Sequence, residues 1–151
     1  DLHFVLLVMA TIENGGYFAQ DREVEPKVAG LNEEYPNRDA MIALLLQTFD
    51  IINELNLPLD SIWFRKSNFF TLVVELATHL EVLPGDLPDR LGALEERILA
   101  NKGDQKSEYG QYYSYMYQAT HGRKARVVRA AVFRRDILGL AEPQLAFDSA
   151  V

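Results

Sequence analysis

The chain has 151 residues, of which 48% are apolar, a net charge of −7 and no cysteine. This length fits one domain with its own core, and the lack of cysteine excludes disulfides, thiolate metal sites and a cysteine nucleophile. No apolar run approaches the roughly 20 residues that span a bilayer, and no signal peptide is apparent. We therefore expect a soluble, cytoplasmic protein with no membrane contact.

The charge is distributed unevenly along the chain. Six of the fifteen basic residues lie between Arg123 and Arg135. With Asp136 included, that segment carries +6 − 1 = +5, so the remainder carries −12. The acidic average opposes nonspecific attraction to nucleic acid, but the average does not describe this segment.

The first half of the chain predicts three helices. Residues 2–13 are apolar on nearly every face and end at Gly15-Gly16, which is typical of a buried helix stopped by glycine. Residues 24–35 carry mixed charges and predict a short surface helix. After a break at residues 36–39, apolar residues recur every three or four positions from Met41 to Leu55 and predict a longer helix.

The stretch from Ser61 to Leu80 should form the centre of the core. It holds the only tryptophan, Trp63, which we expect to be buried against a helix that begins at Phe69. Ser67 or Asn68 is a candidate cap for that helix, because each side-chain oxygen can accept from its first free N–H groups. The helix is apolar on several faces, which indicates that neighbouring elements enclose it.

The second half of the chain predicts three more helices. Residues 89–101 have one apolar side and predict an amphipathic outer helix, and residues 102–107 predict a surface loop. Residues 108–120 contain five tyrosines, and residues 123–138 predict the last long helix. We therefore predict an all-α, single helical-bundle-like domain of about six or seven helices over residues 1–140. Residues 141–151 predict an extended or disordered tail.

The sequence offers no pattern that predicts catalysis, a metal site or a cofactor. The histidines His3, His79 and His121 are far apart, and the closest pairing of metal-ligand types is Glu75 with His79. There is no nucleophile elbow and no phosphate-binding loop. We assign no catalytic residue and no metal ligand, and we expect no cofactor in this chain.

The tyrosine-rich segment and the basic segment after it have two interpretations. Aromatic faces stack on bases and guanidinium groups pair with phosphates, which favours contact with nucleic acid. Alternatively, the tyrosines fill a helical core and the arginines neutralise acidic groups of the same domain or of an upstream one. The candidate nucleic-acid or interdomain contacts are Arg123, Lys124, Arg126, Arg129, Arg134, Arg135 and Lys66.

Several short motifs resemble a known bacterial family. They are Asp1-Leu2-His3-Phe4-Val5, Gly15-Gly16-Tyr17, Trp63 with Lys66-Ser67-Asn68-Phe69-Phe70, and Tyr117-x-Ala119-Thr120 leading to Arg126 and Arg129. Together they resemble the C-terminal helical half of the family that includes the N-terminal part of GmrSD-type, modification-dependent restriction enzymes. The family's ParB-like domain carries an Asp-Gly-Gln-Gln-Arg signature, which is absent from this chain.

The resemblance implies a C-terminal fragment of a longer protein, in agreement with a chain that opens at Asp1 without methionine. It implies a non-catalytic helical domain that supports an upstream ParB-like, nucleotide-dependent or nuclease domain in defence against foreign DNA. The expected partners are that upstream domain and nucleic acid. The alternative is a helical protein-interaction or oligomerisation module, in which a homo-oligomer is possible.

Overall fold

The computed structural model describes residues 1–140, so the predicted tail lies outside the described residues. Within them the chain forms seven α-helices, three short 3₁₀ helices and no strand. The α-helices are α1 (Leu2–Asn14), α2 (Val24–Glu33), α3 (Arg38–Glu54), α4 (Lys66–Thr78), α5 (Leu87–Ala100), α6 (Glu108–Tyr115) and α7 (Arg123–Asp136). The 3₁₀ helices are η1 (Asp21–Glu23), η2 (Ile62–Phe64) and η3 (Leu80–Val82). The prediction of an all-α domain with six or seven helices is confirmed.

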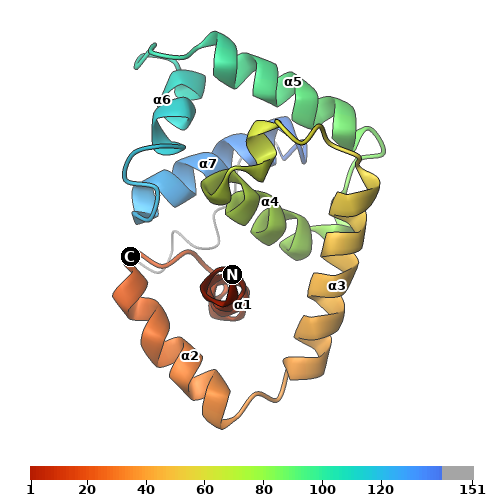
Figure 1. Ribbon diagram of the computed structural model, residues 1–151, viewed down its shortest axis with the longest axis vertical. Helices are drawn as coiled ribbons and strands as arrows, with labels where there is room; N and C mark the ends of the chain where they lie inside the picture. Colours follow the sequence, from red (N-terminus) through yellow and green to blue (C-terminus); the bar gives the residue numbers. More distant parts are fainter. Residues whose placement is uncertain (141–151) are drawn as a thin grey trace.

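Helix α4 lies at the centre of the molecule (Figure 1). Helices α1, α3 and α7 contact it, while α2 and α5 lie toward the periphery. Every residue from Thr71 to Ala77 is buried, because a helix that is apolar on several faces must be covered on each of them. The expected enclosure of this helix is confirmed.

Helix α4 begins at Lys66, three residues before the predicted start, and the predicted caps are wrong. Arg65 occupies the N-cap position and makes no side-chain cap. The Ser67 hydroxyl donates to the Met116 carbonyl at 3.2 Å, and the Asn68 amide donates to the Ile62 carbonyl at 2.9 Å. Both side chains therefore bind partners outside the helix, where the sequence suggested local bonds to its first N–H groups.

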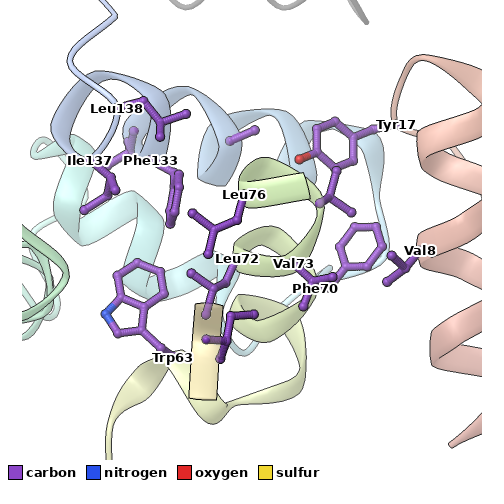
Figure 2. Close-up of a cluster of buried hydrophobic side chains, with 14 of the residues drawn as sticks. Val8, Tyr17, Trp63, Phe70, Leu72, Val73, Leu76, Phe133, Ile137 and Leu138 are labelled. Carbon is purple, nitrogen blue, oxygen red and sulfur yellow. The ribbon is translucent and has the colours of Figure 1, made fainter. Parts of the chain in front are cut away.

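Trp63 is in the core, as predicted. Its side chain is 1% exposed, its indole N–H donates to the Leu91 carbonyl at 3.0 Å, and its ring meets Phe133 edge to face at 5.7 Å. Figure 2 shows Trp63 and Phe133 at one end of the apolar cluster, with Leu72 and Leu76 of α4 beside them. One ring thus connects the segment before α4 to both α5 and α7.

Helix α1 is less buried than its composition suggested. Leu7, Val8, Ala10 and Thr11 are buried, whereas Leu2 is 74% exposed. Every residue from Phe4 to Glu13 is buried or half-buried, whereas Leu2, His3 and Asn14 are exposed, so the predicted burial holds for the middle of α1 and fails at its ends. Its end is as predicted, since Gly15 adopts the left-handed conformation with φ 68°.

The other helices follow their predicted segments, with different ends. Helix α5 buries Leu91, Leu94 and Ile98, which confirms the amphipathic outer helix. Helix α6 ends at Tyr115, five residues before the predicted limit. No helix among residues 1–140 has the length and apolar character needed to cross a bilayer.

Gly110 on α6 marks a close approach that the sequence did not reveal. A Cβ atom at this position would overlap the Asp104 carbonyl and would lie 2.7 Å from the Asn101 carbonyl oxygen. The absence of a side chain therefore lets α6 lie directly against the turn that comes after α5.

Candidate anion-binding pocket

The structure divides the seven predicted contact residues into three groups. Arg126, Arg129 and Arg134 are only 2%, 1% and 1% exposed, respectively. Arg123 and Arg135 are half-buried, and Lys66 and Lys124 are exposed. The basic segment therefore does not form one continuous exposed face, because three of its guanidinium groups lie inside the domain.

Arg134 forms a buried ion pair with Glu75 of α4. Its Nε donates to Glu75 Oε2 at 2.7 Å and its Nη2 donates to Oε1 at 2.9 Å. The Tyr17 hydroxyl donates to the same Oε1 at 2.6 Å, and Figure 2 shows Tyr17 with its hydroxyl directed toward α4 and α7. Burial, together with the charge of Glu75, raises the pKa of Tyr17 well above its usual value. Arg134 thus neutralises a carboxylate of its own domain.

Arg135, near the C-terminal end of α7, also binds residues of the same domain. Its guanidinium group contacts Glu108 at 2.6 Å and Asp136 at 2.8 Å. Hydrogen bonds to these two carboxylates raise the pKa of Arg135. Tyr109 donates to Asp136 at 2.7 Å and completes the cluster, so Arg135 holds α6 and α7 together.

Arg129 is a buried cation bound entirely by neutral groups. Its Nε donates to the Thr71 hydroxyl at 3.2 Å, and its two other donors reach the Tyr115 carbonyl at 2.9 Å and the Thr120 carbonyl at 3.2 Å. Among the hydrogen bonds and ion pairs of residues 1–140, none joins Arg129 to a carboxylate. Burial lowers the pKa of Arg129, and the nearby charge of Arg126 lowers it further.

Arg126 and Arg129, but not Arg134 or Arg135, line a pocket of about 290 Å³ between α1, the start of α4, the loop at residues 116–122 and α7. Its cationic lining comes from Arg65, Lys66, Arg126 and Arg129, with His3 and His121 also present. Its apolar lining comes from Phe4, Leu7, Phe70 and Met116, and its remaining lining residues are Ser67, Tyr117 and Thr120. None of the described residues that line it carries a carboxylate, so the pocket suits an anion with an apolar part.

The loop at residues 116–122 is held in an unusual conformation at the edge of the pocket. Ala119 has φ 49°, a left-handed backbone that a residue with a Cβ adopts at a cost. The bonds from Arg129 to the carbonyls of Tyr115 and Thr120 fix the chain on both sides of Ala119. Tyr117 is exposed, and the Arg65 guanidinium lies 3.9 Å from the centre of its ring. Arg129 therefore shapes one side of the pocket in addition to supplying charge.

The sequence patterns pointed to some of this lining and missed the rest. Lys66, Arg126 and Arg129 are among the contact residues that the sequence predicts, whereas its patterns assign no role to His3 or His121. The lining comes from three stretches, residues 3–7, 65–70 and 116–129, which 45 or more residues separate along the chain, so no local spacing could reveal the pocket. The only usable signal was the presence of basic residues without acidic neighbours in two of these segments.

Comparison with known proteins adds no identification. No protein family, no curated protein and no solved structure that was compared with the chain matches it. The resemblance to the helical half of GmrSD-type proteins therefore stays a prediction that rests on the short motifs in the sequence.

Proposed function

We propose that this chain is a non-catalytic helical domain that binds nucleic acid at the pocket and its basic rim. In this proposal it supports an upstream ParB-like domain in defence against foreign DNA, as the sequence resemblance implies. The observation that carries the proposal is the gathering of Arg65, Lys66, Arg126 and Arg129 around one cavity, in a chain with a net charge of −7.

The exposed rim supplies groups that can reach a nucleic-acid backbone. Lys66 forms an ion pair with Asp1 at 2.7 Å, and both side chains are more than half exposed. Such pairs contribute about 0–1 kcal/mol, so a phosphate can replace Asp1 at little cost. Arg65 and Tyr117 form an exposed cation–π pair beside it, which offers a surface on which a base can stack.

We expect single-stranded DNA to bind with an affinity that falls steeply as salt rises, because phosphate contacts release counterions. Lys66→Gln should weaken binding and reduce the slope of log Kd against log salt by about 0.7. Fluorescence anisotropy at several salt concentrations measures both effects. Lys106→Gln is the matched control, because Lys106 is exposed and lies outside the pocket.

Equal slopes for Lys66→Gln and Lys106→Gln would contradict binding at the pocket. A chain that binds no DNA at low salt would contradict the proposed function as a whole.

One observation favours the second candidate function, a helical protein-interaction or oligomerisation module. Ile42 and Leu46 lie one turn apart on α3 and are 41% and 61% exposed. Adjacent exposed apolar side chains are typical of contact surfaces. Under this function the protein should sediment as a dimer, and the Ile42→Ser/Leu46→Ser variant should sediment as a monomer. A monomer at all protein concentrations would exclude self-association.

A further inference from the structure

Arg129 is a charge whose burial is not balanced by an opposite charge within the part of the chain that the structure describes. It is 1% exposed, and its hydrogen-bond acceptors are one hydroxyl and two carbonyl groups. Removing a cation from water is costly unless an anion lies nearby. The Arg134 guanidinium on the same helix shows the contrast, because it is equally buried and binds both oxygens of Glu75.

Arg126 adds a second buried cation to the same pocket. It is 2% exposed and donates to the Phe18 carbonyl at 2.9 Å. Both guanidinium groups line the same pocket, and the charge of Arg126 lowers the pKa of Arg129, as expected of like charges that repel each other. An anion in the pocket would attract both groups and would offset this repulsion.

Access to these two groups restricts the kind of anion. Because both are nearly inaccessible from bulk solvent, the phosphates of a duplex, which lie on a wide rod, cannot reach them. A phosphate within a strand is also flanked by sugars on both sides. A terminal phosphate monoester is attached on one side only, and it carries about −1.5 to −2 charges at neutral pH. It is therefore the nucleic-acid group with the least bulk around its charge, and it fits best in the pocket that Arg126 and Arg129 line.

The apolar lining indicates which part of the ligand accompanies the phosphate into the pocket. Phe4, Leu7, Phe70 and Met116 line the cavity together with the cationic groups. A volume of about 290 Å³ is just below the usual range for small-ligand sites, about 300–1,000 Å³. It has room for one nucleotide and not for a folded segment of nucleic acid.

We infer that the pocket receives a single nucleotide with a terminal phosphate, which lies against Arg126 and Arg129 while its nucleoside contacts the apolar lining. This inference rests on the proposed function and makes it more specific, because the pocket binds the end of a nucleic-acid strand and not its internal phosphates. The same chemistry is offered by the 5′-phosphorylated end of a strand and by a free nucleoside 5′-monophosphate.

The test compares two single-stranded oligonucleotides of identical sequence, one with a 5′-phosphate and one with a 5′-hydroxyl. We expect the 5′-phosphorylated strand to bind at least about tenfold more tightly, the effect of one or more charge-assisted hydrogen bonds. Adenosine 5′-monophosphate should compete with it, and adenosine should not. Fluorescence anisotropy measures the strands, and isothermal titration calorimetry measures the monophosphate directly.

A pair of variants tests whether the preference for the 5′-phosphorylated strand arises in the pocket, and neither variant removes a buried arginine. Thr120→Glu adds a carboxylate to the pocket lining, where its negative charge repels a phosphate, and should abolish the preference for the 5′-phosphate. Gln118→Glu introduces the same charge into the same loop at an exposed position outside the lining. It should keep at least a tenfold preference, and circular dichroism should show both variants folded.

Each outcome decides a different point. Equal binding of both strands, with the usual salt dependence, would overturn the strand-end inference and would leave the proposed function standing. Binding of the monophosphate without binding of either strand would support the nucleotide pocket and would overturn the nucleic-acid function. If the Thr120→Glu and Gln118→Glu variants prefer the 5′-phosphorylated strand equally, the assignment of binding to this pocket would be overturned. If no ligand binds, both proposals would be overturned.

Discussion

Replacing Arg134 with alanine is expected to lower the free energy of unfolding by about 3–5 kcal/mol, because the Glu75 carboxylate would remain buried without its cation. Glu75 is 0% exposed, and Arg134 donates to both of its oxygens. The Tyr17 hydroxyl would still donate to Oε1 and the His79 ring would still lie 3.5 Å from Oε2, but neither reproduces the two hydrogen bonds of the guanidinium group. Urea denaturation followed by circular dichroism measures the loss.

The control for this variant is the exposed ion pair between Lys66 and Asp1. Lys66→Ala should cost no more than about 1 kcal/mol, since water solvates both charges. Replacing the buried pair together, as Glu75→Leu/Arg134→Met, should recover much of the stability lost in Arg134→Ala. Equal losses for Arg134→Ala and Lys66→Ala would show that the buried pair is solvated.

Trp63→Ala should also cost about 3–5 kcal/mol, the range for a large core aromatic. The substitution removes a fully buried ring, its edge-to-face contact with Phe133 and the donor that satisfies the Leu91 carbonyl. Phe64→Ala is the matched control, because Phe64 belongs to the same 3₁₀ helix and is 41% exposed. A Trp63→Ala midpoint in urea within error of the Phe64→Ala midpoint would contradict the role of Trp63 in the core.

The helices could be predicted from the sequence wherever one apolar stripe faced one partner. The stripes of α3 and α5 located both helices, and the apolar density around Trp63 located the core. The ends were harder, because they depend on bonds to distant groups. Serine commonly caps helices, for example, yet the Ser67 hydroxyl donates to the Met116 carbonyl, 49 residues away.

The positions of the arginines on α7 could not be predicted in the same way. Arginine is rarely buried unless it is paired, and the acceptors described for Arg126 and Arg134 come from remote segments. Phe18 and Glu75, for example, are separated from their arginines by 108 and 59 residues. The sequence allowed both an exposed basic face and an internal role. The structure places Arg134 in an internal role and brings Arg126 and Arg129 to a pocket.

The buried pair between α4 and α7 also limits how these two helices can be aligned. If α7 slid by one turn in either direction, Ala130 or Leu138 would replace Arg134 opposite Glu75. Neither side chain can donate a hydrogen bond, so each shifted register would leave the buried carboxylate without its guanidinium partner, with only the Tyr17 hydroxyl and the His79 ring beside it. Apolar contacts alone would discriminate weakly between these registers, because similar side chains recur along both helices. The ion pair therefore selects one alignment of the core from several that hydrophobic burial would accept.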